Sequence, residues 1–568
     1  MANLNTDAIK KKTYDAIVIG SGVSGGWAAK ELTEKGLKVL MLERGKPLEH
    51  ITGYAEANKD PWEYEHRGRI TVQQALDNPF QKRDYPMSEQ NAHYWFQDKK
   101  ALYEEVKRFD WFRPDIVGGK SIMWGRQSYR LTDIDFEANI KDGHGVDWPI
   151  RYKDIAPWYD YAEKFAGISG ENLGNYPSYP DGQLLPPMPL NVVEADVRKR
   201  LEAAFPNRRM TIGRVANLTQ NHNGRSACNY RNMCSRGCPF SAYFSTQGST
   251  LPAAMATKRL TVRPYSIVNS ILYDAKKGKA KGVLVIDSQT NERIEFNAKI
   301  IFVCASAIST GWILMNSTSP QFPNGLGNAS GELGHNVMDH HFRTGASGQV
   351  EGYLDKYVFG RRPNGVYIPR YRNIGDDKRD YVRGFGYQGG ASRNGFGRVV
   401  AQEGFGAEMK AMATEPGNWS MGITGFGECL PYHENHIKLS PDKKDAWGQP
   451  TIIFDVEFKE NEKKMRIDMA NDAKEMLEAA GLKNVRTYDN GSWPGMAIHE
   501  MGTARMGRDP KTSVLNSMNQ IHDCKNVFVT DGACMTSTSC VNPSLTYMAL
   551  TARAADFAVS ELKKGNLK

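Results

Sequence analysis

The sequence has no long apolar run. A membrane-spanning helix needs about 18 or more consecutive apolar residues, and no such stretch occurs in the 568 residues, so we expect no transmembrane segment. Residues 1–12 are polar and lack the apolar centre of a secretory signal, so we expect no targeting signal in this chain. This predicts a cytoplasmic location, or a periplasmic one if a signal-bearing partner subunit is exported with the chain. No repeat of about 20–50 residues is found, which argues against a solenoid or a propeller.

Cysteine is scarce and charge of one sign is not concentrated. There are only eight cysteines in this long chain, so a disulfide scaffold is a weak explanation for them. The net charge of +9 comes from scattered Lys and Arg, which favours a solvated basic surface over nucleic-acid binding. With 40% hydrophobic and 24% charged residues, the composition is typical of a globular protein, and the length predicts two interleaved domains.

A dinucleotide-binding pattern lies close to residue 20. Residues 14–19 form a β-branched run typical of a buried parallel strand, and they lead directly into Gly-Ser-Gly-Val-Ser-Gly at 20–25. A helical stretch follows to about residue 35, and residues 37–42 predict the next strand. Strand, glycine turn, helix and strand in this order predict a bound dinucleotide far more strongly than the glycines alone.

Each special residue of this pattern has a physical role. Gly20 and Gly22 let the turn tighten and the backbone approach a pyrophosphate, while Gly25 lets the helix pack closely on the strand. The helix N-terminus offers N–H donors to the phosphates. Glu43 follows the second strand, where a carboxylate accepts hydrogen bonds from ribose hydroxyls.

Further motifs extend to the other end of the chain, at residues 117–125, 148–150 with 158–159, 300–307, 331–334 with 338–340, 499–507, 527–532 and 540–546. Together with residues 20–25, these blocks resemble those of the glucose–methanol–choline (GMC) oxidoreductases, and the resemblance extends from residue 14 to the C-terminal helix. The resemblance implies an α/β fold, with a doubly wound FAD-binding sheet plus an α+β substrate domain that has a mostly antiparallel sheet. It predicts an FAD-binding domain over 12–339, a substrate-binding domain over 340–494, and the C-terminal part of the FAD-binding domain over 495–568.

The resemblance also implies the site residues. His499 and Asn542 match the family's catalytic pair, and a histidine that titrates near neutral pH is suited to take the hydroxyl proton as hydride leaves the carbinol carbon. Met123 stands where some relatives tether FAD through a histidine, so non-covalent FAD is expected. The positions expected to bind FAD are Gly20, Gly22, Gly25, Glu43, Gly118, Gly119, Ser121, Asp531, Gly532, Asn542 and Pro543.

Three of the cysteines form a local cluster. Cys228, Cys234 and Cys238 lie within eleven residues in the pattern C-x5-C-x3-C-P. Three thiolates favour a 3Fe–4S centre, since most other iron–sulfur clusters use four, and the spacing resembles a cluster segment of bacterial GMC sugar dehydrogenases. Two alternatives stay open, namely no metal, or zinc with His222 as a fourth ligand.

The resemblance is nearest to bacterial FAD/iron–sulfur sugar dehydrogenases such as the large subunit of glucoside 3-dehydrogenase. It implies oxidation of a pyranose C3 hydroxyl in a sugar or glycoside, with a small subunit and a cytochrome c or quinone acceptor. Glucose 1-dehydrogenase, gluconate 2-dehydrogenase or oxidase chemistry with O2 are alternatives, and a catalytically silent FAD scaffold is a third class. Tyr387 and Phe426 are candidates to stack on a sugar ring, although a plain core role is favoured for each.

Overall fold

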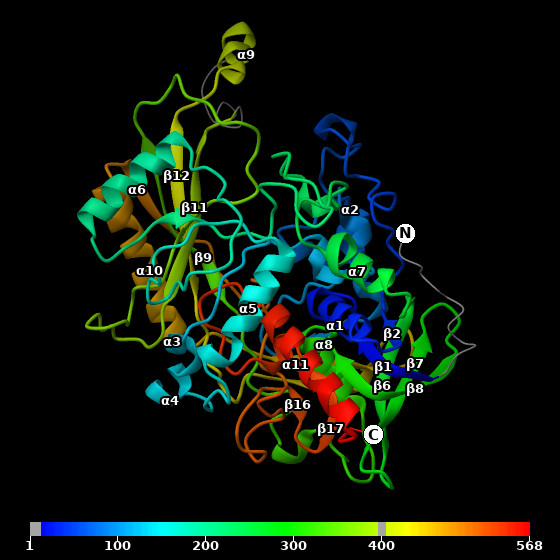
Figure 1. Cartoon of the computed structure of the whole chain (residues 1–568). Helices are drawn as coiled ribbons and strands as arrows, with labels where there is room; N and C mark the ends of the chain where they lie inside the picture. Colours follow the sequence, from blue (N-terminus) through cyan, green and yellow to red (C-terminus); the bar gives the residue numbers. More distant parts are fainter. Residues whose placement is uncertain (1–12, 396–404, 568) are drawn as a thin grey trace.

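The computed structural model describes residues 13–395 and 405–567, which form three β-sheets with helices packed around them. Figure 1 shows the two larger sheets side by side, with β9, β11 and β12 in one and β1, β2, β7 and β8 in the other. The helices include α2 (Val72–Asp77), α3 (Asp133–Phe136), α4 (Ala138–Asp142), α5 (Tyr152–Ala166), α7 (Leu251–Ala256) and α9 (Gly406–Thr414). In the part of the chain that is described, no helix is both long and apolar enough to span a bilayer.

The first sheet is the predicted doubly wound sheet. Its strands in spatial order are β16 (Gln520–Ile521), β17 (Cys524–Val529), β8 (Arg293–Val303), β1 (Thr13–Ile19), β2 (Val39–Leu42) and β5 (Leu260–Arg263). The pairs from β17 to β5 are all parallel, and the hairpin of β6 (Ser266–Asp274) and β7 (Lys279–Asp287) adds antiparallel to β8. Since the sheet joins strands from both ends of the chain, the fold class expected from the motifs is confirmed.

Both faces of this sheet are buried, which explains the apolar sequence of β1. Ala16 and Val18 pack into one core with α1 (Val23–Glu34) and α7, while Ile17 and Ile19 pack into another with α8 (Ala307–Asn316) and the β6–β7 hairpin. Successive side chains of a strand point to opposite faces, so apolar residues are favoured at nearly every position of a strand that is covered on both sides. The C-terminal helix α11 (Ser544–Lys564) packs on α1 (Figure 1).

The second sheet is antiparallel, and most of its strands fall within residues 340–494, the range predicted for the substrate-binding domain. Its strands in spatial order are β15 (Lys483–Asp489), β9 (His341–Val350), β12 (Trp419–Gly427), β11 (Phe385–Arg393), β10 (Val366–Ile368) and β4 (Thr211–Ile212). Helices α6 (Val192–Ala204) and α10 (Glu460–Ala479) cover one face. Strand β4 and helix α6 lie outside residues 340–494, so an earlier segment of the chain adds an edge and a cover to this sheet.

Alternation along β12 separates the core face of the second sheet from the site face. Trp419, Met421 and Ile423 are buried against α10, whereas Phe426 points to the other side and lines the cavity described below. The same alternation in β11 buries Tyr387 and turns the next residue toward the cavity. The favoured core role of Tyr387 is therefore observed, and only Phe426 of the two aromatic candidates can meet a ligand.

A small third sheet takes up the segment that follows β12. It contains β13 (His436–Lys444), β14 (Pro450–Asp455) and the short strand β3 (Glu104–Glu105). Residues 437–439 thus pair with β14 and belong to a different sheet from residues 419–423 of β12. Phe454 of β14 stacks on Phe109, with ring centroids 4.2 Å apart, which ties an N-terminal segment to this sheet.

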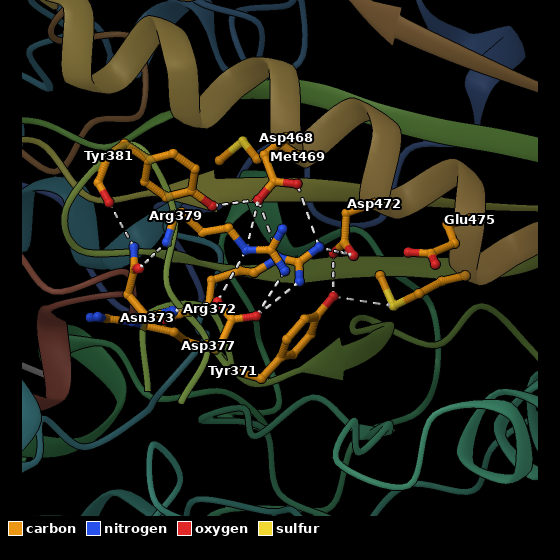
Figure 2. Close-up of polar contacts among 12 residues, drawn as sticks. Tyr371, Arg372, Asn373, Asp377, Arg379, Tyr381, Asp468, Met469, Asp472 and Glu475 are labelled. Atoms are coloured by element: carbon orange, nitrogen blue, oxygen red, sulfur yellow. Dashed lines mark hydrogen bonds and ion pairs between the residues drawn. The ribbon is translucent and has the colours of Figure 1, made fainter. Parts of the chain in front are cut away.

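A buried polar network fastens α10 to the segment after β10 (Figure 2). The fully buried carboxylate of Asp472 accepts hydrogen bonds from Tyr371, from Arg372 at 2.6 Å and from Tyr387 at 3.0 Å. Arg208 forms a further ion pair with Asp472 at 3.1 Å. Asp472 thus pairs with both guanidinium groups, while Asp377 and Asp468 also pair with Arg372 and Glu475 with Arg208, so every buried charge here has an opposite partner.

Candidate active site

A cavity of about 620 Å³ lies at the carboxyl ends of β1, β2, β8 and β17, where doubly wound sheets bind their ligands. The second sheet contributes Gln388 and Phe426 to its lining. Among the positions predicted to bind FAD or act in catalysis, those that line the cavity are Gly20, Gly22, Glu43, Gly119, Asp531, Gly532, Asn542, Pro543 and His499. Gly25, Gly118 and Ser121 lie behind this surface.

The glycine turn fits a dinucleotide. A Cβ on Gly22 would have no protein atom within 4 Å, so this side of the turn is an open cradle above the N-terminus of α1. By contrast, a Cβ on Gly25 would lie 2.0 Å from the carbonyl oxygen of Gly20, which shows that Gly25 serves the packing of helix on strand. Gly20 has φ of 95°, a left-handed conformation that glycine adopts without strain.

Glu43 is held in place at the end of β2. Its carboxylate accepts from the backbone N–H of Ser21 at 3.0 Å and of Gly45 at 2.8 Å, while burial raises its pKa. The neighbouring Arg44 also lines the cavity, and its Nε and Nη2 are buried with no hydrogen-bond partner among the described residues. Buried polar groups normally have partners, so these unsatisfied donors indicate room for a polar ligand beside Glu43.

The loop after β3 meets the glycine turn directly. The N–H of Gly118 donates to Oγ of Ser21 at 2.8 Å, and Oγ of Ser121 donates to the Gly118 carbonyl at 2.6 Å. Gly118 and Gly119 have φ of 100° and 51°. Ser121 therefore shapes the loop from behind, and Met123 rather than a histidine lines the cavity next to it. A methionine thioether offers no tether for a flavin.

Asp531 and Gly532 close the cavity at the end of β17. Asp531 accepts from Thr310 Oγ1 at 2.6 Å and from the N–H of Ala533 at 2.9 Å, and burial raises its pKa to about 6. A Cβ on Gly532 would lie 2.3 Å from the carbonyl oxygen of Glu500. The glycine is thus required for the segment that carries His499 to lie against the end of this strand.

His499 and Asn542 are brought together although 43 positions separate them in the chain. Nδ2 of Asn542 lies 3.3 Å from Nε2 of His499, and both residues line the cavity. Oδ1 of Asn542 accepts from Nε2 of Gln388 at 2.7 Å. Burial, together with His340 and Lys120, lowers the pKa of His499 well below its usual value, so the imidazole is neutral and able to accept a proton.

Two residues that the sequence did not single out for a role contact His499 from behind. Nδ1 of His340 lies 2.8 Å from Nδ1 of His499, and the carboxylate of Asp339 accepts from the backbone N–H groups of His499 and Ala497, each at 3.0 Å. Residues 338 and 501 form an antiparallel bridge that places the two segments side by side. The motif block 338–340 marked this segment, but a partner about 160 residues away leaves no local pattern.

A lysine–carboxylate pair lies at the edge of the same cavity. Nζ of Lys120 donates to the carboxylate of Glu500 at 2.7 and 2.9 Å. Asp84 is close enough for Lys120 to influence its pKa, but burial is the larger effect and raises the pKa of Asp84 well above its usual value. Neither carboxylate oxygen of Asp84 has a hydrogen-bond partner within the described residues.

The three cysteines of the local cluster lie near one another and next to the cavity. Cys234 lines the cavity, burial raises the pKa of Cys228 and Cys234, and the neighbouring thiols raise the pKa of Cys228 further. His222 interacts with the carbonyl of Lys164 at 2.6 Å. Across residues 13–395 and 405–567, no group of three or more His, Cys, Asp or Glu side chains is arranged so that it could hold a metal ion, so the zinc alternative finds no support here.

Comparison with protein families gives two matches. A family model described as GMC oxidoreductase matches residues 14–342, and a second with the same description matches residues 431–551. Together they cover more than half of the chain and include both the glycine turn and His499 with Asn542.

Several curated proteins are similar over almost their whole length. 2-Methyl-1,2-propanediol dehydrogenase of Mycolicibacterium austroafricanum is 31% identical over 572 aligned positions, covering 96% of this chain and 94% of the relative. The fructose dehydrogenase large subunit of Gluconobacter japonicus is 25% identical, covering 97% and 98% of the two chains. The gluconate 2-dehydrogenase flavoprotein of Pantoea cypripedii is 24% identical, covering 96% and 93%.

Proposed function

This chain belongs to the GMC oxidoreductase family, and on that premise we propose that it is a sugar or glycoside dehydrogenase that oxidises a secondary pyranose hydroxyl, preferably at C3, to a ketone. The family and its dehydrogenase relatives make the chain an FAD oxidoreductase that acts on CH–OH groups. The FAD is proposed to be non-covalent, because Met123 stands in the cavity where a tether would be.

One observation carries the catalytic part of the proposal, namely a neutral His499 whose Nε2 faces the cavity beside Asn542. The FAD supplies the hydride acceptor. His499 takes the proton of the substrate hydroxyl at Nε2, and the amide N–H of Asn542 donates to the same oxygen and keeps it in line. Gln388 holds the amide in the required orientation, since its Nε2 donates to the amide oxygen.

The substrate class is supported by the relatives and by the cavity. Two relatives are named for fructose and gluconate, which are sugar-type compounds. Phe426 lines the cavity, and its ring stacks on that of Phe342 with the ring centroids 5.2 Å apart. An aromatic side chain in the cavity wall can pack against the apolar side of a sugar ring. Gln388 adds an amide that can hydrogen-bond hydroxyl groups.

A second candidate function is oxidation of a small acyclic diol. It is favoured by the higher identity, 31%, to the relative named 2-methyl-1,2-propanediol dehydrogenase. A panel of glycosides, free sugars, gluconate and small diols with an acceptor dye separates the candidates, and NMR of the product locates the new carbonyl. Preferred turnover of a glycoside with a carbonyl at C3 supports the first proposal, whereas turnover of diols alone contradicts it.

The aromatic face gives a sharper form of this test. Phe426→Ala is expected to raise KM for a pyranoside about 3- to 10-fold, the equivalent of one lost stacking contact, with a smaller change in kcat. An acyclic diol has no ring face to stack, so its KM serves as the internal control. An equal increase in KM for both substrates would count against ring stacking on Phe426.

The electron acceptor is a separate part of the proposal. The spacing of Cys228, Cys234 and Cys238 supports a 3Fe–4S relay, and relatives named as a large subunit and a flavoprotein support a partner subunit with a cytochrome c or quinone acceptor. No metal-ion site is found at these thiols in the part of the chain that the structure describes, so no step of the reaction is assigned to them. Iron analysis and electron paramagnetic resonance on anaerobically purified protein test the cluster, and rapid peroxide formation in air would favour an oxidase.

The base is tested with His499→Ala, with FAD content measured in parallel. Proton abstraction by a positioned general base contributes about 10²- to 10⁴-fold to a rate, so single-turnover reduction of the flavin should slow by that factor. A variant that binds FAD and reduces it at the wild-type rate contradicts the assignment.

A further inference from the structure

We propose that His340 is a positioning residue that fixes the tautomer of His499, so that the ring nitrogen facing the cavity carries a lone pair and not a proton. The inference rests on the proposed role of His499 as the base. It assigns a task to a residue that lies outside the cavity lining and reaches the substrate only through His499.

The direction of the hydrogen bonds starts from a backbone carbonyl. Nε2 of His340 lies 2.8 Å from the carbonyl oxygen of Ser539, and because a carbonyl can only accept, this nitrogen must carry the proton. In a neutral imidazole the other nitrogen is then an acceptor, so Nδ1 of His340 accepts from Nδ1 of His499 across 2.8 Å. His499 is therefore protonated at Nδ1, and Nε2 is left with its lone pair.

The hydrogen bonds on the cavity side of His499 require the same tautomer. Nε2 of Gln388 donates to Oδ1 of Asn542, which leaves the NH2 group of Asn542 turned toward Nε2 of His499 at 3.3 Å. An NH2 group can only donate, so Nε2 of His499 must be the acceptor. Both ends thus require the same tautomer, and no other assignment satisfies all four contacts.

His340 is fully buried and His499 is half-buried in the cavity wall, and both surroundings favour neutral imidazoles. Burial is the main cause that lowers the pKa of His340, and it lowers the pKa of His499 even further. A neutral His340 matters, because a protonated ring would carry hydrogens on both nitrogens and could not accept from His499.

The backbone next to the two histidines adopts unfavourable dihedral angles at two positions. Ile498 has φ of 63°, a left-handed conformation that is an outlier for a β-branched residue, and the carboxylate of Asp339 clamps the turn through the N–H groups on either side of it. Ser539 has φ of 57°, and its N–H donates to Glu428 at 3.2 Å. Strain of this kind persists only where the surroundings impose it, and here it directs a carbonyl and an imidazole toward His340.

The test compares His340→Leu with His340→Asn, two side chains of similar shape. The oxygen of Asn can take the place of Nδ1 as an acceptor, whereas Leu offers none. In single-turnover flavin reduction with saturating substrate, we expect the Leu variant to be slower by about 10²- to 10⁴-fold, the range for losing a partner that orients a histidine or sets its tautomer. We expect the Asn variant to stay within about tenfold of wild type, because the acceptor is kept.

Readouts other than rate separate a tautomer effect from a folding effect. FAD content and substrate Kd should be unchanged in both variants, because the contacts of His340 lie behind the cavity. Both variants lose the hydrogen bond to the Ser539 carbonyl, so both should unfold at a similarly lower temperature, and this shared loss cannot account for a difference in rate between them. Equal rates in the two variants would overturn the proposal, whether both are fast or both are slow.

A measurement on the wild-type holoenzyme keeps the proposal falsifiable even if the Leu variant does not fold. Nitrogen NMR of protein labelled at histidine, with the His499 signals identified by their loss in His499→Asn, should show a proton on Nδ1. A proton on Nε2 would overturn the proposal. If His499→Ala remains active, the proposed base is wrong, whereas loss of activity in that variant together with a normal Leu variant refutes only the role of His340.

Discussion

Gly22 is the position at which dinucleotide binding can be tested without disturbing the fold. Its backbone has φ of −68° and ψ of −161°, which an L-residue adopts without strain, and a Cβ added there meets no protein atom within 4 Å. Gly22→Ala should therefore leave the free energy of unfolding of the FAD-free protein unchanged. The added methyl group projects into the cavity, where the pyrophosphate is expected to approach the backbone.

The expected magnitude follows from the hydrogen bonds that the methyl group prevents. A hydrogen bond from a backbone N–H to a charged phosphate oxygen contributes about 1.5–3 kcal/mol. Loss of one such bond corresponds to a roughly 10- to 150-fold increase in the Kd for FAD. The assay is titration of FAD-free protein with FAD, followed by the change in flavin fluorescence, with urea unfolding measured on the same preparations.

Two other glycines of the same segment are matched controls. A Cβ on Gly25 would lie 2.0 Å from the Gly20 carbonyl oxygen, so Gly25→Ala should destabilise the protein itself. Gly36 has φ of 97° and open space around it, so Gly36→Ala should cost about 1–2 kcal/mol in stability and leave the Kd for FAD unchanged. If Gly22→Ala binds FAD as tightly as wild type, the pyrophosphate does not approach this turn and the reasoning is refuted.

Three further predictions concern buried charges. Burial, His340 and Lys120 lower the pKa of His499, so this base stays unprotonated in mild acid. The midpoint of the acid limb in the pH profile of kcat/KM should therefore lie below about pH 6.5, and a midpoint above that value contradicts a neutral His499. The raised pKa of Asp84 means that the folded protein loses stability as pH rises above the ordinary carboxyl pKa of about 4, so Asp84→Asn should be more stable than wild type by at least about 1.4 kcal/mol at about pH 8, with little gain at about pH 3, in urea unfolding; a gain that does not depend on pH refutes this. Asp472→Ala removes the fully buried carboxylate that Arg372 (Figure 2) and Arg208 share and leaves them only more exposed partners, Asp377, Asp468 and Glu475, so it should lose about 3 kcal/mol, whereas Asp77→Ala in the exposed pair with Lys99 should lose less than about 1 kcal/mol; similar losses would contradict the difference.

The sequence determined the local elements and their class of ligand. The run at residues 14–19, the glycines after it and Glu43 lie within one strand–helix–strand unit, so adjacent residues carry the whole pattern, and the structure has this unit with the predicted strand, turn and helix. The motif blocks likewise led to the family and to the doubly wound sheet. The sequence could not assign the two faces of β12 to core and site, because alternation separates the faces but does not say which one meets a ligand.

Only the tertiary structure decided how the site is assembled. His340, His499, Gln388 and Asn542 come from distant segments, and each hydrogen bond between them depends on a chain fold that no local pattern records. Close spacing of the three cysteines in sequence likewise does not decide what they bind: their thiols are near enough to raise the pKa of Cys228, but the described residues show no site there for a metal ion. Spacing constrains a site only within one element, whereas the orientation of side chains across elements is set by packing and by burial of their polar atoms.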